Sequence, residues 1–194
     1  MPSSPAVRPL TLQEARAVYQ QHLTRDFQRS ERKPWSRIED ALGRGRYLCL
    51  GLFCQDALAG YAFFASLPDE TEGRNYLLDY FAVLPALRGR GLGSDFLRRM
   101  LPLIPDARCI LCEAENPDYA EDAAEKARQE SRLRFYCRSG VADTGVTARV
   151  YGVEYRILLF PGAEKSSAEI RGLYEAFYHS FFPPAVYRQQ VLIR

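Results

Sequence analysis

Hydrophobic positions follow two spacings along the chain, and each spacing predicts one kind of element. Apolar residues three or four positions apart predict amphipathic helices, whereas runs of aromatic and aliphatic residues bounded by turn residues predict strands. The helices expected from this pattern cover residues 12–23, 34–42, 93–104, 118–139 and 167–182. The expected strands cover residues 6–9, 47–54, 58–67, 75–83 and 107–114, and two more fall within 146–160.

The order of these elements predicts an α/β protein with a mixed sheet. Gln55 and Asp56 are turn residues between two adjacent strands, so they predict an antiparallel hairpin. A polar loop over 69–75 leads to the strand 75–83, which ends before Pro85 because proline cannot donate to a strand ladder. The helix and strand that follow complete a unit of strand, helix and strand, which we expect to be parallel and right-handed.

Composition and charge narrow the class of protein. The 194 residues are 47% hydrophobic and 26% charged, which is typical of a globular protein with its own core. The net charge of +2 gives no reason to expect nucleic acid or an anionic membrane as a partner. Residues 1–10 lack the apolar core of a secretory signal, and no apolar run is long enough to span a bilayer. We therefore expect a cytoplasmic protein.

The cysteines and histidines do not predict a metal site. Cys109 and Cys112 form a CxxC pair, but they fall in an apolar run that reads as a strand, where residues three apart point to opposite faces. We interpret both as buried thiols of the core. His22 and His179 each lack a second histidine at the spacing of metal ligands, so we expect no metal.

A glycine-rich run, LRGRGLGSDFL, separates the strand 75–83 from the next helix. A turn of this kind leaves backbone N–H groups unpaired at the positive end of the helix dipole, which favours an anion. Gly91 and Gly93 would let the backbone approach the anion closely, while Arg88, Arg90 and the Ser94 hydroxyl would add hydrogen bonds. Two other interpretations stay open, namely a plain structural turn with solvated arginines and an RNA-binding segment.

The run and its surroundings resemble a known family. FAVLPALRGRGLGSDFL is similar to the acetyl-CoA-binding signature of the GNAT superfamily of N-acetyltransferases, with Arg88, Gly91 and Gly93 at its fixed positions. FYCRSGV at 135–141 is similar to a second stretch of that family, with Val141 where phenylalanine is usual. The order of elements from residue 6 to residue 160 agrees with the family as well.

The resemblance implies a fold and a domain plan. We expect a GNAT-like mixed, splayed central sheet flanked by helices, with an N-acetyltransferase domain over 1–160. Residues 161–194 would be a helical C-terminal extension that packs on the domain or on a partner subunit, so a homodimer is open. Its apolar stripe must be covered by something and consists of Ile170, Leu173, Tyr174, Phe177 and Phe181.

The resemblance also implies acetyl-CoA as the cosubstrate. Its pyrophosphate would be held by the backbone of Arg88, Gly89, Arg90, Gly91, Leu92, Gly93 and Ser94. The pantetheine amides would pair with the strand end at Phe81, Ala82 and Val83, like an added strand. Asn116 would hydrogen-bond the same arm, and Tyr136 would lie at the cofactor.

Catalysis needs a proton donor for the departing thiolate and a base for the amine. In the family Tyr136 matches the usual general acid, and the alternative is an aromatic ring that packs its helix on the sheet. Asp79 and Glu113 are the candidate bases, with Glu115 behind them, because a carboxylate in an apolar strand is costly to bury unpaired. Each carboxylate could instead pair with an arginine or a backbone amide, and a water relay could replace a direct base.

These observations predict an enzyme that moves the acetyl group of acetyl-CoA to a primary amine of a small molecule or peptide, by direct transfer in a ternary complex. The alternative is a non-catalytic domain that binds or senses acyl-CoA. The segment 25–35 could form part of the wall for the acceptor amine or could be a solvated helix connection.

Overall fold

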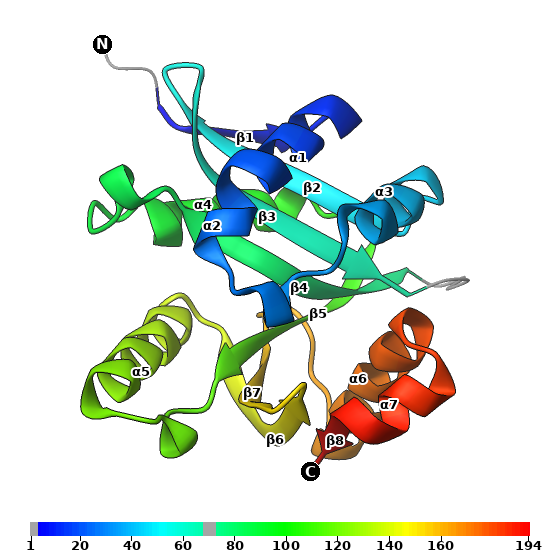
Figure 1. The fold of residues 1–194 in the computed structure, drawn as a ribbon. Coiled ribbons are helices and arrows are strands. Elements are labelled where there is room, and N and C mark those ends of the chain that lie inside the picture. The colour runs from blue at the N-terminus through cyan, green and yellow to red at the C-terminus, as the bar shows by residue number, and fades with distance from the viewer. Residues whose placement is uncertain (1–3, 68–72) are drawn as a thin grey trace. The chain divides into compact units, whose positions relative to one another are not determined.

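The computed structural model describes residues 4–67 and 73–194 (Figure 1). Residues 69–72 of the expected polar loop lie outside the described residues. Over the described residues, eight strands follow the order β1-β2-β3-β4-β5-β7-β6-β8 in a mixed, splayed sheet flanked by helices. This confirms the expected fold class.

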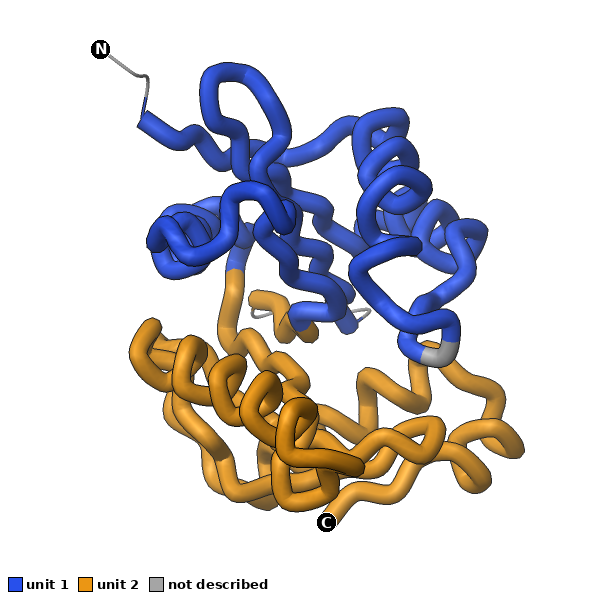
Figure 2. Tube along the Cα trace, turned by 60° about the vertical axis from the view of Figure 1, so that its left-hand side comes forward, with its two compact units in different colours: residues 1–68, 78–106 blue, residues 69–77, 107–194 orange. Residues whose placement is uncertain are grey.

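The chain divides into two compact units, which are described separately below (Figure 2). Unit 1 comprises residues 1–68 and 78–106, and unit 2 comprises residues 69–77 and 107–194. Strand β4 (Arg74–Val83) contributes its first residues to unit 2 and its last residues to unit 1. The domain boundary predicted at residue 160 stays a prediction.

The strands of unit 1 begin with an antiparallel set. β1 (Ala6–Pro9) pairs with β2 (Tyr47–Cys54), and β2 pairs with β3 (Ala57–Ser66). Gln55 and Asp56 connect β2 to β3 with φ angles of 51° and 62°, as a two-residue turn with two positive φ angles requires. The predicted hairpin is therefore confirmed.

The first helical segment of unit 1 is less regular than its pattern predicts. α1 (Leu12–Val18) begins at a capping box, in which Thr11 Oγ1 accepts from the backbone N–H of Glu14 at 3.2 Å and the Glu14 carboxylate accepts from Thr11 N–H at 2.8 Å. The helix then widens into the π-helical turn η1 (Tyr19–Leu23) before α2 (Thr24–Asp26). The expected single helix over these residues is thus broken by a π-turn.

The remaining helices of unit 1 agree with the pattern apart from their ends. η2 (Arg29–Glu31) leads to α3 (Trp35–Gly43), whose N-cap is Pro34, so the proline precedes the helix instead of opening it. α4 (Leu92–Met100) passes into the 3-10 turn η4 (Leu101–Leu103), where the prolines predicted to stop the helix begin. The core of the unit is aromatic and includes Tyr61, Phe63, Phe64 and Phe96, each 0% exposed.

The strands of unit 2 are three predicted strands and one, β8, that the sequence pattern did not predict. Among the predicted strands, β7 (Val153–Leu159) lies antiparallel between β5 (Ala107–Glu115) and β6 (Ala142–Val150). The chain end forms β8 (Val191–Ile193), which pairs with β6 in an antiparallel register with Val150 opposite Val191. The C-terminal segment is therefore joined to unit 2 by backbone hydrogen bonds as well as by its helices.

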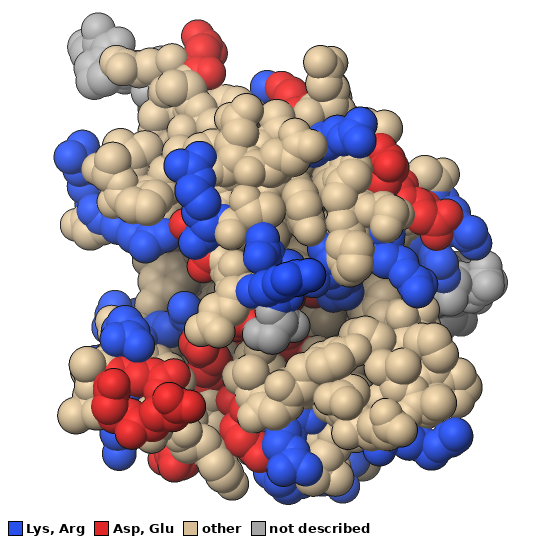
Figure 3. All heavy atoms as spheres, in the orientation of Figure 1, with Lys and Arg blue, Asp and Glu red and all other residues tan. Residues whose placement is uncertain are grey.

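The long helix of unit 2 starts later than predicted. Its residues are α5 (Ala123–Arg138), and its N-cap is Asp122, which accepts from the backbone N–H of Glu125 at 2.7 Å. The residues before it form the 3-10 turn η5 (Pro117–Tyr119), because Asn116 caps that turn separately. Acidic side chains gather over α5 on the face drawn in Figure 3, as suits a solvated helix with acids in its first turn.

The tail of unit 2 is largely helical, with α6 (Ser167–Phe181) and α7 (Pro184–Gln190) before β8. In Figure 1, α5 and α6 lie on opposite sides of the strands β5, β7 and β6. The buried residues of α6 are Ile170, Tyr174, Phe177 and Tyr178, so Tyr178 joins three members of the predicted stripe. Among the described residues, no helix combines the length and apolarity needed to cross a bilayer.

Candidate functional site

The turn between β4 and α4 has the geometry of an anion site. Gly89 and Gly91 have φ angles of +75° and +77°, a backbone conformation that residues with a side chain rarely adopt. A Cβ on either glycine would meet nothing within 4 Å. Gly91 is the N-cap of α4, and as a glycine it has no side chain with which to cap the helix. The open space beside Gly89 and Gly91 therefore leaves room for a ligand at the positive end of α4.

Arg88 points its guanidinium back toward the protein. Its Nε donates to the Val83 carbonyl oxygen at 2.8 Å, and its Nη2 lies 3.4 Å from Asp26 Oδ1. The other oxygen of Asp26 accepts from the buried Tyr61 hydroxyl at 2.8 Å. Arg88 thus ties the end of β4 to α2, although its side chain is 56% exposed, and Arg90 is exposed as well.

The end of β4 is closely packed against β3. Ala82 and Val83 are each 8% exposed, and a Cβ on Gly60 would lie 2.8 Å from the Ala82 carbonyl oxygen. Only glycine permits this approach at residue 60. The Phe81 ring packs on Phe96 of α4 with centroids 5.3 Å apart, so the strand end and the glycine-rich turn share one support in unit 1.

Asp79 is a buried, ion-paired carboxylate of β4. Its side chain is 6% exposed, and it forms a salt bridge with Lys33 and accepts a hydrogen bond from Tyr47. Burial, followed by the Asp79 charge, raises the pKa of Tyr47, so this hydroxyl remains a donor. The backbone N–H of Lys33 also donates to the Tyr80 hydroxyl at 2.7 Å, which holds the segment before α3 on β4.

Glu113 is held by two tyrosines of the C-terminal extension. The hydroxyls of Tyr174 and Tyr178 in α6 both donate to its Oε1. Burial, followed by the charge of Glu113, raises the pKa of both tyrosines. Glu115, two residues on, pairs instead with Arg132 of α5 at 2.6 Å.

Tyr136 lies in α5 and is 6% exposed. Its ring meets Phe160 edge to face with centroids 6.5 Å apart, so it also packs its helix on the sheet. Burial, followed by the neighbouring thiol of Cys112, raises the pKa of Tyr136 and keeps the hydroxyl protonated. No described residue hydrogen-bonds this hydroxyl. Because Cys112 and Glu113 are adjacent in β5, Tyr136 and Glu113 belong to opposite faces of that strand.

Asn116 follows β5 and is 5% exposed. Its Oδ1 accepts from the backbone N–H of Asp118 at 3.2 Å and from Nε of Arg156 at 3.1 Å. The predicted site residues divide between the two units. Unit 1 holds Asp79, the strand end and the glycine-rich turn, and unit 2 holds Glu113, Asn116 and Tyr136.

Sequence reasoning missed the partners of these residues. Arg156 directly precedes the buried apolar residues of β7, and a charge beside such residues is a usable signal for a polar partner. Tyr174 and Tyr178 are four residues apart on α6, so they share one helix face, but only Tyr174 was noted and only as an apolar residue. Asp26 carries no distinguishing pattern.

Comparison with known proteins defines the family. The model of the acetyltransferase (GNAT) family matches residues 12–136, so the chain belongs to that family. Members use acetyl-CoA as cosubstrate, and the chain is accordingly an N-acetyltransferase that takes its acetyl group from acetyl-CoA. A search of curated proteins finds no significant match.

Solved structures share the fold at low sequence identity. A protein from Bacteroides thetaiotaomicron assigned to the GNAT family has a TM-score of 0.69 at 17% identity, covering 91% of this chain and 98% of its own. Arabidopsis thaliana NAA60 in complex with acetyl-CoA has a TM-score of 0.59 at 14% identity, covering 81% and 98%. The ribosomal-protein-S18-alanine N-acetyltransferase of Escherichia coli has a TM-score of 0.54 at 18% identity, covering 84% and 97%.

Within the described residues, no three or more histidine, cysteine, aspartate and glutamate side chains are grouped as metal ligands would be. Cys49, Cys109 and Cys112 are buried free thiols, which agrees with the interpretation of the CxxC pair as core.

Proposed function

We propose that the chain transfers the acetyl group of acetyl-CoA directly to a primary amine of a small molecule or peptide, in a ternary complex without an acyl-enzyme. The observation that carries this proposal is the glycine-rich turn of unit 1. There, Gly91 opens α4 with a left-handed backbone and leaves the first N–H groups without a side-chain cap. Such a helix end suits a pyrophosphate.

Donor binding is assigned mainly to backbone groups. The N–H groups over residues 88–94 would hold the pyrophosphate, with the exposed side chain of Arg90 as a cation beside them. The strand end at 81–83 would pair with pantetheine amides through those backbone groups that remain open. The Val83 carbonyl is an exception, because it already accepts from Arg88. Arg88 therefore supports the turn and does not lead the contact with phosphate.

The chemistry needs one proton removed and one supplied. The amine nitrogen forms a bond to the thioester carbonyl carbon, and the carbon–sulfur bond then breaks to release CoA. Tyr136 would give its proton to the departing thiolate, and its raised pKa means that the hydroxyl still carries that proton at neutral pH. Because Glu113 belongs to the opposite face of β5 from Tyr136, it would take the proton of the amine through water and later release it to solvent. The Tyr136 phenolate would be reprotonated from solvent.

Glu113 is proposed as the base in preference to Asp79. A proton on Asp79 would remove the charge that balances Lys33 in a site where the aspartate is 6% exposed. Two hydrogen-bond donors of Glu113, Tyr174 and Tyr178, are neutral hydroxyls, so protonating the carboxylate separates no ion pair at these two contacts.

The acceptor class rests on the family and on what related proteins acetylate. The solved relatives include a spermidine N-acetyltransferase from Vibrio cholerae and the S18-alanine enzyme of Escherichia coli. Their acceptors are amines of a small molecule and of a protein. They support an amine acceptor for this chain and do not choose between the two kinds.

A matched pair of glycine variants tests the donor site. Gly91→Ala would place a methyl group where the backbone of the turn is proposed to contact the pyrophosphate. We expect acetyl-CoA to bind about tenfold more weakly, equivalent to about 1.4 kcal/mol. Gly152→Ala is the control, because Gly152 also has a positive φ of 85° and open space around it, in the turn between β6 and β7. Calorimetry with acetyl-CoA measures both variants.

Turnover is measured in the same preparations as release of free CoA across a panel of small amines and peptides. Equal weakening by both glycine variants would refute the assignment of the turn. Tight acetyl-CoA binding without CoA release from any amine would favour a domain that senses acyl-CoA over an enzyme of this mechanism.

A further inference from the structure

Asn116 has one hydrogen-bonding group for which the described residues provide no partner. Its backbone N–H donates to the Glu154 carbonyl at 2.8 Å, and its backbone carbonyl accepts from Tyr119 at 3.0 Å. Its Oδ1 accepts two hydrogen bonds, from Asp118 N–H and Arg156 Nε. Among the described residues, nothing accepts a hydrogen bond from its Nδ2, although the residue is only 5% exposed.

This pattern fixes which way the amide faces. A side-chain amide oxygen has two lone pairs, and both donors of Asn116 Oδ1 are unambiguous, because a backbone N–H and a guanidinium can only donate. Rotating the amide by half a turn would place the Nδ2 group of Asn116 against two other donors, the backbone N–H of Asp118 and Nε of Arg156. Nδ2 is therefore held as a donor for which the described residues supply no acceptor. It is not one of their fully buried unpaired side-chain atoms, so it remains accessible to an acceptor from outside the protein.

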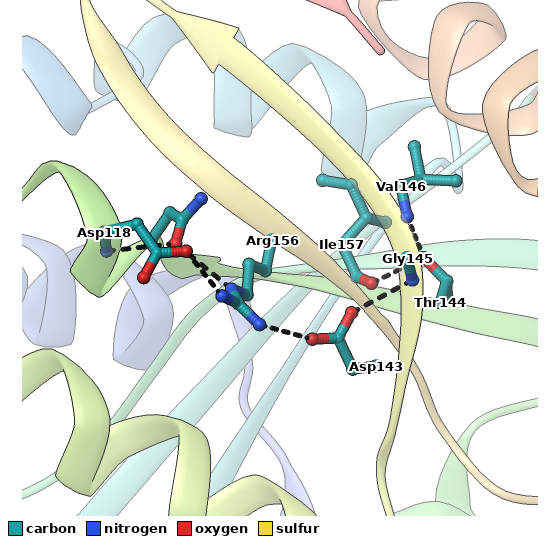
Figure 4. Close-up of polar contacts among 8 residues, drawn as sticks. Asp118, Asp143, Thr144, Gly145, Val146, Arg156 and Ile157 are labelled. Atoms are coloured by element: carbon teal, nitrogen blue, oxygen red, sulfur yellow. Dashed lines mark hydrogen bonds and ion pairs between the residues drawn. The ribbon is translucent and has the colours of Figure 1, made fainter.

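Arg156 is the residue that makes this orientation rigid. Its planar guanidinium contacts three groups from different segments of unit 2 (Figure 4): Nε reaches Asn116, Nη1 lies 3.1 Å from Asp143 Oδ2, and Nη2 lies 2.8 Å from Asp118 Oδ2. A guanidinium bonded on three sides cannot swing without breaking several bonds. Asp143 is fixed in turn, because its other oxygen accepts from Gly145 N–H at 3.0 Å.

The charges of this cluster argue against two simpler roles. Two carboxylates already balance Arg156, so it is poorly suited to bind a phosphate or a substrate carboxylate. Asp118 and Asp143 have side chains 62% and 36% exposed, and ion pairs as open as these add little to stability. What the cluster does supply is a defined direction for the Asn116 amide.

We propose that Arg156 is a positioning residue, which holds Asn116 so that Nδ2 donates to a carbonyl oxygen of the pantetheine arm of acetyl-CoA. The inference rests on the proposed function, since it takes acetyl-CoA as the ligand. It adds a residue of β7, outside the matched region of the family, to the binding machinery of the chain.

The test compares two ligands that differ in the arm. Acetyl-CoA carries the arm, whereas adenosine 3′,5′-bisphosphate carries only the nucleotide end. Arg156→Met removes the guanidinium and keeps an unbranched apolar side chain, and we expect acetyl-CoA to bind about fivefold to tenfold more weakly, as for one lost hydrogen bond. The affinity for adenosine 3′,5′-bisphosphate should not change. Calorimetry with the full chain measures both.

Three further variants separate positioning from general damage. Arg194→Met removes another ion pair of unit 2, the one with Glu154, and leaves the cluster around Arg156 intact, so it should bind both ligands as the unaltered protein does. Arg156→Lys keeps the charge but lacks the Nε donor, so it should reproduce the selective loss even if Arg156→Met folds poorly. Arg156→Met added to Asn116→Ala should cause no further loss of acetyl-CoA affinity.

The outcomes are distinct. Loss of both ligands in equal proportion, or no loss of either, would overturn the role of Arg156 while the unaltered chain still binds acetyl-CoA. If the unaltered chain does not bind acetyl-CoA, the proposed function fails, and this inference fails with it.

Discussion

Asp79 in unit 1 and Glu113 in unit 2 are similar in sequence and different in structure. Each is a carboxylate inside an apolar strand, and each receives a hydrogen bond from at least one buried tyrosine. Asp79, however, also faces the ammonium group of Lys33, whereas the two hydroxyls that donate to Glu113 are neutral. The two carboxylates are therefore stabilised differently, Asp79 by an ion pair and a hydroxyl and Glu113 by two hydroxyls.

The difference bears on which carboxylate can change its charge. An ion pair in which the aspartate is 6% exposed stabilises the fold only while both charges remain, so it suits a structural role. Hydroxyl donors tolerate either charge state of the carboxylate more readily, because a protonated carboxyl oxygen still accepts hydrogen bonds. Glu113 is thus the better proton acceptor of the two, and three sets of variants test this contrast.

The largest effect is expected on turnover. Glu113→Gln preserves shape and removes the proton acceptor, so kcat should fall about 100-fold or more, the range of general base catalysis. Asp79→Asn should change kcat by no more than about threefold in protein that remains folded, since a group outside the chemistry contributes little. Tyr136→Phe should lower kcat in the same way as Glu113→Gln. Stopped assays of CoA release with one amine acceptor measure all three variants.

The opposite ranking is the informative failure. A large loss of kcat in Asp79→Asn, with a normal unfolding midpoint, would transfer the role of base to unit 1. Equal activity of Glu113→Gln and the unaltered protein would leave a water relay as the route for the proton.

The next effect concerns stability. Asp79→Ala leaves Lys33, whose side chain is 21% exposed, without its carboxylate, and we expect the free energy of unfolding to fall by about 3 kcal/mol. Urea denaturation followed by circular dichroism measures the change. The double variant Asp79→Leu with Lys33→Met removes both charges and should recover most of the loss. If the double variant is as unstable as Asp79→Ala, packing and not the charge explains the effect.

The sequence predicts the elements better than their partners. The alternation and spacing of apolar residues are local properties, so the strands, the hairpin at Gln55 and the helix after Gly91 could be predicted without the fold. The capped start of α5 could not, because Asn116 and Asp122 both favour a helix start and only tertiary contacts decide between them. β8 is three residues long and depends on β6 for its pairing, so no pattern of its own marks it.

The candidate site shows the same division. Glycine positions and the motif around Arg88 identify a place for the donor, since they depend on backbone conformation that only certain residues adopt. The direction of the Arg88 side chain depends on Asp26, which lies 62 residues away in sequence. Likewise, the partners of Glu113 come from a helix more than 60 residues further along the chain. Contacts at such separations leave no local periodicity to detect.

The smallest effect completes the contrast between charged and neutral partners. Tyr174→Phe and Tyr178→Phe each remove one hydroxyl from Glu113, and each should lower the free energy of unfolding by about 1.5 kcal/mol, as for a hydrogen bond to a charged group. Tyr119→Phe is the matched control, because Tyr119 is 59% exposed, and it should have no effect. Adding Glu113→Met to both phenylalanine variants should restore stability, since these three side chains then have no polar group left unpaired.

A loss of stability in Tyr174→Phe or Tyr178→Phe greater than that in Asp79→Ala would contradict this contrast. It would show that the hydroxyl donors stabilise a carboxylate more than the ammonium group does, and would reverse the assignment of Glu113 as the better proton acceptor.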